Sequence, residues 1–238
     1  MIDIHSHIIF GVDDGPSTIE QSASMICHAE KAGIETIVAT PHSHEPLFDS
    51  ERLTDNYQEL LYRIRSCNIT LKLGYEVFIN PAVQTADWKS MELTLDRSRY
   101  LLFELPFNSS PKDGFDLLHI FSLKDTVPII AHPERYRNFL RNFNELNGYI
   151  NAGCMIQIDA ASILGVYGRD VRECAKKLLK LNRADFVASN AHCPEDYANW
   201  YRKAFDEVSK WTGDENARRL FLSNAQCILN REEKMHAV

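Results

Sequence analysis

The chain has 238 residues, 45% of them hydrophobic, which is enough to bury the core of one large domain or two small ones. Acidic residues (33) outnumber lysine and arginine (26), and the net charge of −7 argues against a general nucleic-acid binder. The opening MIDIHSHIIF lacks the basic segment of a signal peptide, and no stretch reaches the ~20 apolar residues of a membrane helix. The six cysteines form no C-x-x-C pair. We therefore expect a cytoplasmic protein with free thiols.

Short apolar segments alternate with amphipathic ones, the pattern of βα units around a parallel sheet. In chain order, the expected strands are Met1–His5, Glu35–Thr40, Thr70–Val77, Arg99–Leu105, Val127–His132, Met155–Asp159 and Phe186–Asn190. The expected helices are Thr18–Ala32, Glu51–Ser66, Phe115–Leu123, Asn144–Ala152, Val171–Leu181 and Asp196–Trp211. No repeat or linker divides the chain, so we expect a single domain over residues 1–238.

Every expected strand delivers a histidine, a carboxylate or an amide to its carboxyl end, where barrel enzymes carry their sites. These residues are His5 and His7, His42, Glu76, Glu104, His132, Asp159, and Asn190 with His192. Each alone is more commonly a hydrogen-bonded or solvated side chain. Clustered together, however, two carboxylates and several imidazoles lack partners unless cations neutralise them. The pattern therefore predicts a metal site whose nitrogen and oxygen ligands suit Mn²⁺, Fe²⁺ or Zn²⁺.

The motifs H-S-H, D-D-G-P, T-P-H, G-Y-E, F-E, A-H-P-E-R and S-N-A-H follow one another along the chain. In this order the sequence resembles the polymerase and histidinol phosphatase (PHP) superfamily. It is most similar to the manganese-dependent protein-tyrosine phosphatases of bacterial capsule and exopolysaccharide synthesis. The resemblance runs from Met1 to about Asn224. It implies an α/β fold, a distorted (β/α)7 TIM-like barrel, that holds three divalent metal ions, Mn²⁺ first among the candidates.

The resemblance also implies roles for individual residues. The first ion would be held by His5, His7, Glu76 and Asn190, the second by Glu76, Glu104 and His132, and the third by Asp14, His42 and His192. Arg135 would hold the substrate phosphate, because a guanidinium fork can bind two phosphoryl oxygens, and we expect Arg135 and His42 to be catalytic. The implied reaction is attack of a metal-activated hydroxide on phosphotyrosine of a protein, in particular a membrane-associated bacterial tyrosine kinase.

This sequence departs from the family pattern in two places. Asn190 stands where the family has aspartate, and an amide brings no negative charge and cannot accept a proton. Either the site tolerates a weaker first ion, or the chain is an impaired relative, or the change was introduced deliberately. Second, no arginine follows His192 before Arg202. Arg169 or Arg137 could substitute for it, although surface charge is the commoner role.

Other residues leave alternatives open. Asp13 is either a ligand in place of Asp14 or the cap of the turn at Gly15. His44 faces the site or the solvent, Asp159 and Glu134 could orient ligands, and Glu134 could instead pair with Arg135. Three aromatic residues could stack on a substrate ring or simply pack in loops, namely Phe48, Phe107 and Tyr136. Cys193 is expected to be a packed side chain.

Two other functions compete with the protein phosphatase. One is hydrolysis of a small phosphomonoester such as histidinol phosphate, because a fold does not determine the substrate. The other is a metal-binding but catalytically impaired regulator that docks on a kinase, a hypothesis motivated by Asn190.

Overall fold

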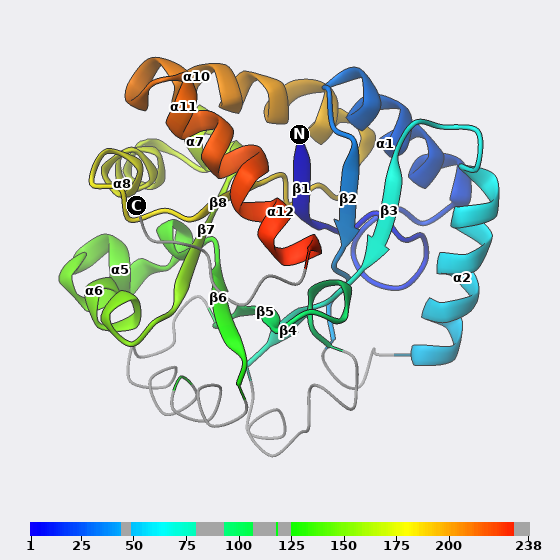
Figure 1. The fold of residues 1–238 in the computed structure, drawn as a ribbon, viewed down its shortest axis with the longest axis horizontal. Coiled ribbons are helices and arrows are strands. Elements are labelled where there is room, and N and C mark those ends of the chain that lie inside the picture. Colours follow the sequence, from blue (N-terminus) through cyan, green and yellow to red (C-terminus); the bar gives the residue numbers. More distant parts are fainter. Residues whose placement is uncertain (44–48, 80–92, 107–117, 119–124, 231–238) are drawn as a thin grey trace.

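Two sheets of parallel strands, flanked by helices, form the framework of the protein (Figure 1). The computed structural model describes residues 1–43, 49–79, 93–106, 118 and 125–230. Strands and helices alternate through most of these ranges, which confirms the predicted parallel α/β fold.

The first sheet contains β1 (Ile2–Ser6), β2 (Thr36–Ala39) and β3 (Thr70–Leu73), in that order and all parallel. Between them in the chain come α1 (Ile19–Lys31) and α2 (Ser50–Arg63), which lie along the same side of the molecule (Figure 1). The Thr18 hydroxyl accepts a hydrogen bond from the Gln21 N–H at the start of α1, which satisfies one of the free donors of its first turn.

The second sheet contains five parallel strands: β4 (Glu76–Phe78), β5 (Tyr100–Glu104), β6 (Val127–Ala131), β7 (Met155–Asp159) and β8 (Phe186–Ala188). The sequence predicts one continuous strand over Thr70–Val77, and this is wrong, because the segment divides at Gly74 into β3 and β4 of different sheets. A Cβ atom at Gly74 would lie 2.9 Å from the Leu95 Cα, so the chain can turn here only with glycine.

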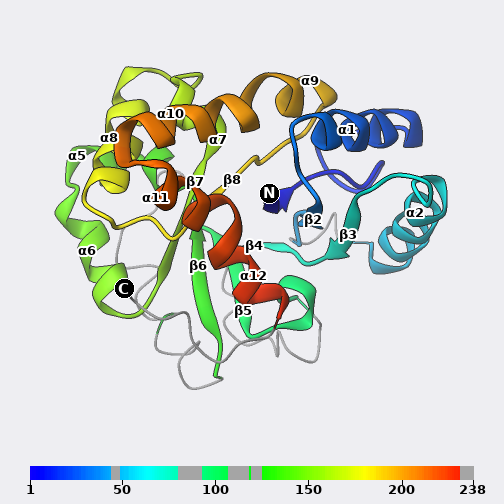
Figure 2. The same ribbon diagram turned by 45° about the horizontal axis from the view of Figure 1, so that its top comes forward.

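The helices of the second half of the chain lie mainly around the second sheet, although Pro194–Asp196 lies beside α1 (Figure 2). They are α5 (Arg137–Arg141), α6 (Asn144–Asn151), α7 (Ala160–Leu164), α8 (Arg169–Lys180), α9 (Pro194–Asp196), α10 (Arg202–Thr212), α11 (Asp214–Arg218) and α12 (Asn224–Leu229), with π-helical turns at Tyr197–Tyr201 and Arg219–Ser223 and 3₁₀ turns at Leu95–Arg97 and Pro133–Arg135. The short helices α5 and α7 and those beyond residue 212 are absent from the sequence prediction. The helix predicted at Phe115–Leu123 lies outside the described residues except for Leu118.

Side chains on one face of the strands of both sheets pack together in a single apolar cluster. The cluster contains Ile2, Ile4, Val38, Leu95, Tyr100, Leu102, Ile129, Ala131, Phe186, Ala188, Ala225 and Ile228. The last two belong to α12, which crosses in front of the strands in Figure 1. The other face of the strands packs against the helices in a larger cluster. The strands are therefore buried on both faces, as their nearly continuous apolar sequences indicate.

The two sheets touch along two lines, which we call seams. At the β1–β8 seam, the His7 N–H donates to the Ala191 carbonyl (2.9 Å) and the Asn190 N–H to the His5 carbonyl (2.9 Å). At the β2–β4 seam, the Glu76 N–H donates to the Pro41 carbonyl (3.2 Å), and the Glu76 carbonyl accepts from Ser43. Each seam contains one isolated parallel bridge and no continuous ladder among the described residues.

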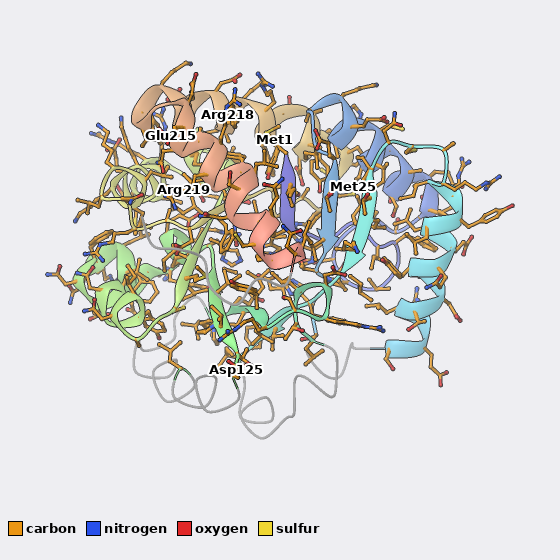
Figure 3. All side chains as sticks on the ribbon, viewed as in Figure 1. Met1, Met25, Asp125, Glu215, Arg218 and Arg219 are labelled. Atoms are coloured by element: carbon orange, nitrogen blue, oxygen red, sulfur yellow. The ribbon has the colours of Figure 1, made fainter. Side chains whose placement is uncertain are left out.

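Hydrogen bonds of Met1, Asp125 and Arg219, three of the residues labelled in Figure 3, hold the segments at the amino ends of strands. The Met1 amino group donates to the Gly33 carbonyl (2.7 Å), and Asp125 accepts from the Arg99 guanidinium (2.7 Å). Arg219 donates to the Asn182 side chain (2.8 Å). Within the described ranges, no helix combines the length and the apolar character that crossing a bilayer requires.

Candidate metal centre

Eight of the nine residues predicted as metal ligands lie near the carboxyl ends of strands or in the segments that follow them, and the ninth, Glu76, begins β4 just after the end of β3. β1 carries His5 and is followed by His7 and Asp14, β2 is followed by His42, β4 begins with Glu76, β5 ends at Glu104, β6 is followed by His132, and β8 by Asn190 and His192. Because the carboxyl ends of parallel strands share one edge, residues far apart in the sequence meet there.

Glu76 lies at the centre of this group and is only 1% exposed. Its Oε2 is 3.3 Å from His5 Nε2, 3.3 Å from His7 Nε2 and 3.2 Å from His42 Nδ1, and its Oε1 is 3.0 Å from His132 Nε2. Burial alone would raise the pKa of Glu76, but His5 and hydrogen bonds from the surrounding imidazoles hold it well below its usual value. One ionised carboxylate is thus shared among four rings.

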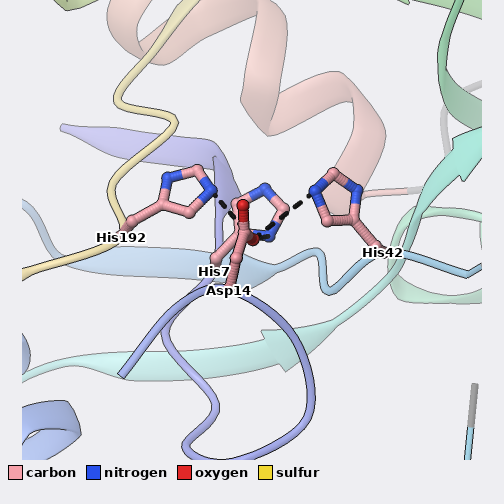
Figure 4. Close-up of side chains that lie close together, drawn as sticks. All are labelled: His7, Asp14, His42 and His192. Carbon is pink, nitrogen blue, oxygen red and sulfur yellow. Dashed lines mark ion pairs between the residues drawn. The ribbon is translucent and has the colours of Figure 1, made fainter. Parts of the chain in front are cut away.

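A second group opens toward solvent around Asp14, which is 68% exposed (Figure 4). Asp14 Oδ1 lies 3.3 Å from His192 Nε2, 3.5 Å from His42 Nε2 and 3.9 Å from His7 Nδ1. The rings of His7 and His192 are stacked, with centroids 4.1 Å apart. The hydrogen bond from His192 lowers the pKa of Asp14, so this carboxylate is charged at neutral pH.

Glu104 completes a third group with Glu76 and His42. Its Oε1 lies 3.5 Å from His42 Nδ1. Burial, reinforced by the charge of Glu76, raises the pKa of Glu104 to about 7. Burial together with the neighbouring His7 lowers the pKa of His42 to about 4, so the His42 ring is neutral at pH 7 and retains a lone pair for a ligand.

The structure therefore brings candidate ligand atoms together in three overlapping groups, each within 4.8 Å: His7, Asp14, His42 and His192; His5, His7 and Glu76; His42, Glu76 and Glu104. These groups differ from the assignment of ligands that the sequence resemblance implies. His7 belongs to the group of Asp14 as well as to that of His5 and Glu76. His42 belongs to the group of Asp14 and to that of Glu76 and Glu104. No cysteine belongs to these groups, and their nitrogen and oxygen atoms fit divalent ions such as Mn²⁺ and Zn²⁺.

Two of the candidate ligands have left-handed backbone conformations. His132 has φ of 36° and Asn190 has φ of 49°. Such conformations are uncommon for residues with a side chain, histidine and asparagine being among the more tolerant, and they concentrate at functional sites. Both residues directly follow a strand or lie close to its end, so the turn directs their side chains to the shared edge.

Further polar groups fix the orientation of the histidine rings. Asp13 Oδ2 accepts a hydrogen bond from His7 Nδ1 (2.7 Å) and from the His42 N–H (3.2 Å), and Asp13 Oδ1 accepts from the Gly15 N–H (3.0 Å). Asp13 therefore caps the turn, as one sequence interpretation has it, and also supports His7. Gln157 Oε1 lies 3.0 Å from His5 Nδ1, which leaves His5 Nε2 facing Glu76.

Gln157 is absent from the sequence prediction. The available signal is that Gln157 and Asp159 alternate on β7 and point to the same face, and a glutamine inside a buried strand needs a polar partner.

Arg135 is fixed on two sides beside this centre. Its Nη1 donates to Asp159 Oδ2 (3.1 Å), and its guanidinium carbon lies 4.2 Å from the centre of the Tyr167 ring. Glu134, which is fully buried, accepts a hydrogen bond from the Asp159 N–H (2.9 Å). Burial, together with the charge of Asp159, raises the pKa of Glu134 to about 7. Arg135 thus points its charge toward the strand ends from a supported position.

The other described residues considered for the site from the sequence do not belong to the three groups of candidate ligands. Arg137 and Arg169 are exposed, each at the first residue of its helix. Tyr136 is buried, and its hydroxyl accepts a hydrogen bond from the Leu105 N–H (3.1 Å), so it packs in the core. Cys193 is partly buried beside Asp196. His44, Phe48 and Phe107 lie outside the described residues.

A parallel α/β fold that gathers imidazoles and carboxylates at the carboxyl ends of its strands defines a class of proteins suited to bind several divalent ions. Residues 1–230 match the family described as capsular polysaccharide synthesis, CpsB/CapC, and the chain belongs to this family. The family resemblance predicted from the sequence is therefore confirmed.

Curated relatives and a solved structure agree with this assignment. The tyrosine-protein phosphatase YwqE of Bacillus subtilis is 34% identical over 196 residues, which cover 81% of this chain and 77% of YwqE. The tyrosine-protein phosphatase CpsB of Streptococcus pneumoniae is 28% identical and covers 96% of this chain and 98% of its own. A solved structure of the metal-dependent tyrosine phosphatases YwqE and CpsB from these organisms has a TM-score of 0.89 at 30% identity, covering 97% and 95% of the two chains.

Proposed function

We propose that this chain is a metal-dependent protein-tyrosine phosphatase of capsule or exopolysaccharide synthesis. Its curated relatives YwqE and CpsB, which match over 77% and 98% of their own length, are tyrosine-protein phosphatases, and the related solved structure is of metal-dependent tyrosine phosphatases. The observation that carries the proposal in this chain is the buried Glu76 carboxylate, shared by four imidazoles beside the supported guanidinium of Arg135.

The residues present fit divalent ions by the chemistry of their donor atoms. We assign the ligands to His5, His7, Asp14, His42, Glu76, Glu104, His132, Asn190 and His192, for three ions with Mn²⁺ as the preferred metal. When bound, such ions supply positive charge against phosphoryl oxygens and lower the pKa of water. Asn190 Oδ1 supports the fit, because it is buried and has no hydrogen-bond partner within the described part of the chain.

The substrate phosphate is expected to bind to Arg135, because a guanidinium can donate two parallel hydrogen bonds to phosphoryl oxygens. Asp159 and the ring of Tyr167 hold this side chain in place, which lowers the entropic cost of ordering it around the substrate. His42 lies between Asp14 and Glu104 and is neutral at pH 7, so it can act as a ligand without first losing a proton.

The partner that we propose is a phosphotyrosine-bearing protein, in particular a membrane-associated bacterial tyrosine kinase of polysaccharide export. The family of this chain functions in capsular polysaccharide synthesis. We also propose a cytoplasmic location, supported by the six cysteines, none of which forms a disulfide.

We further propose that the two sheets form one distorted (β/α)7-type barrel, and that residues 1–238 are a single domain. The support comes from the two seams, each with a parallel bridge, and from the apolar cluster that strands of both sheets share. Counting β3 and β4 as one interrupted strand gives the seven strands of such a barrel.

The proposed function is tested by comparing initial rates of phosphate release from a phosphotyrosine peptide and from histidinol phosphate, with Mn²⁺ and after chelation. We expect Mn²⁺-dependent release with a clear preference for the peptide. His42→Ala and Glu104→Ala should abolish release while circular dichroism shows a folded protein. Preference for histidinol phosphate would support a small-molecule phosphatase, and silence on both substrates would favour the docking regulator. Full activity of either variant would contradict the proposed site.

A further inference from the structure

Asn190 and Asp159 form a hydrogen-bonded pair beside the candidate metal centre. Asn190 Nδ2 donates to Asp159 Oδ2 (3.2 Å), the same oxygen that accepts from Arg135 Nη1 (3.1 Å). The other oxygen, Asp159 Oδ1, accepts from Gln157 Nε2 (3.0 Å). Asp159 is fully buried at the end of β7, and Asn190, just after β8, is 5% exposed. The pair therefore links the end of β7 to the turn that follows β8.

The charge of Asp159 determines how the Asn190 amide is oriented. An ionised carboxylate only accepts hydrogen bonds, so the amide nitrogen must face Asp159 and the amide oxygen must face away from it. Both Asp159 oxygens accept hydrogen bonds from nitrogen donors, Oδ1 from Gln157 and Oδ2 from Arg135 and Asn190, which is the pattern of a carboxylate that carries no proton.

In this arrangement the side-chain oxygen of Asn190 faces away from Asp159. Oδ1 is buried without a hydrogen-bond partner in the ranges that the structure describes, a state that costs free energy unless another ligand binds there. The backbone places Asn190 beside His5, a member of the group around Glu76, because the Asn190 N–H donates to the His5 carbonyl (2.9 Å). An amide oxygen can coordinate a divalent ion.

We propose, on the basis of the proposed function, that Asp159 is a positioning residue that aims Asn190 Oδ1 at a metal ion, so that Asn190 is matched to Asp159 and is not a defect. The two positions together hold one negative charge. A carboxylate at position 190 would place two carboxylate oxygens at about the 3.2 Å that now separates donor and acceptor, inside a buried site.

The test is a cycle of three variants: Asn190→Asp, Asp159→Asn and the double variant. Thermal unfolding is measured on the chelated full chain, and Mn²⁺ binding by calorimetry. We expect each single variant to lower the melting temperature by about 5–10 °C, because it breaks a buried polar pair. The double variant again places a donor opposite an acceptor and should recover at least half of the combined loss.

Asp185→Asn provides the matched control. Asp185 is a partly buried aspartate of the β8 segment, but it precedes the strand and accepts from the Ile156 N–H (2.8 Å). Its effect should add to that of Asn190→Asp without recovery. Additive losses in the Asp159 cycle would overturn the proposal. A single Asn190→Asp variant that is as stable as wild type and binds Mn²⁺ tenfold more tightly would overturn it too.

A further variant, without a change of charge, keeps the test decisive if the variants of the cycle do not fold. Asn190→Ala removes Oδ1 without adding charge, and we expect it to weaken the binding of one Mn²⁺ ion by about 10–100-fold. Binding equal to that of wild type would contradict the role of Asn190 Oδ1. None of these measurements uses a phosphorylated substrate, so a failure of the proposed phosphatase activity would be seen separately.

Discussion

The two seams between the sheets are stabilised by different kinds of contacts. At the β1–β8 seam, the buried Asp3 carboxylate accepts hydrogen bonds from the Ser189 N–H (2.9 Å), the Ser189 hydroxyl (2.5 Å) and the Tyr197 hydroxyl (2.8 Å). The His7 N–H extends the pairing to the Ala191 carbonyl. The polar groups around Asp3 satisfy one another through protein atoms.

At the β2–β4 seam, the side chains beyond the backbone bonds are mainly ionisable. His42 lies between Glu76 and Glu104, whose carboxylates are close enough for the charge of Glu76 to raise the pKa of Glu104. Such a concentration of ionisable groups has a high desolvation cost, which bound cations would offset. Candidate ligands lie beside both seams, but the β1–β8 seam also contains the buried hydrogen-bond network of Asp3, whereas the side chains at the β2–β4 seam are mainly candidate ligands.

The largest expected effect is on activity and comes from Glu76→Gln at the β2–β4 seam. The amide removes the charge that four imidazoles share, so Mn²⁺-dependent phosphate release should fall by more than the roughly 10–100-fold typical of groups one layer further from a metal. Initial rates with a phosphotyrosine peptide measure this. Glu173→Gln, on the exposed side of α8, is the control. Activity within threefold of wild type would refute the central position of Glu76.

Asp3→Ala should have the largest effect on stability, because it leaves three buried donors at the β1–β8 seam without their acceptor. We expect a loss of about 2–5 kcal/mol in the free energy of unfolding, by analogy with other broken buried polar networks. The loss should be equal with Mn²⁺ and with chelator, as measured by urea unfolding. If the loss occurs only in the presence of Mn²⁺, the two seams are not distinct in the way described.

The third effect is a pH dependence of metal binding caused by Glu104. In the metal-free protein its pKa is raised to about 7, so this carboxylate is protonated below pH 7 and must lose its proton to bind a cation. The stabilisation from the bound proton is present at low pH and is lost as the pH rises through 7. Glu104 should therefore contribute an increase of up to about tenfold per pH unit to the Mn²⁺ affinity between pH 6 and 7.

Calorimetric titrations at several pH values measure this dependence, and Glu104→Gln is the matched variant. The slope should become shallower in the variant, because His42, with a pKa of about 4, contributes no proton in that range. An unchanged slope would assign the proton to another group.

The smallest expected effect comes from Tyr167→Ala, which removes the ring that packs on Arg135. A cation–π contact at a partly exposed site contributes about 0.5–1 kcal/mol, so KM for the phosphotyrosine peptide should rise about two- to fivefold with little change in kcat. Tyr167→Phe keeps the ring and should behave like wild type. A large loss of kcat in Tyr167→Ala would instead show that Tyr167 takes part in the chemical step.

The sequence predicts the positions of the strands well because each is a short apolar segment with a polar residue at its carboxyl end. It fails at Gly74, where the division into β3 and β4 depends on the close approach of Leu95, a tertiary contact that no local pattern shows. The short helices α5 and α7 are missed for a similar reason: each has only five residues, too few for a helical period to be visible.

The candidate site is predictable to the level of which residues meet, because parallel strands bring their carboxyl ends to one edge. How they group is not predictable, since it depends on the loop that carries Asp14 back toward His42 and His192. The role of Gln157 and the pairing of Asp159 with Asn190 also depend on distances across the sheet. Sequence alone therefore presents Asn190 as a departure from the family, whereas the structure provides a partner for it.

The most direct test of the central claim is to titrate the chelated protein with Mn²⁺ while bound metal and phosphate release from a phosphotyrosine peptide are measured on the same samples. Our expectation is no release from the metal-free protein and release that rises as ions bind, to a limit of three per chain. Release from protein shown to contain no metal, or three bound ions without release, would contradict it.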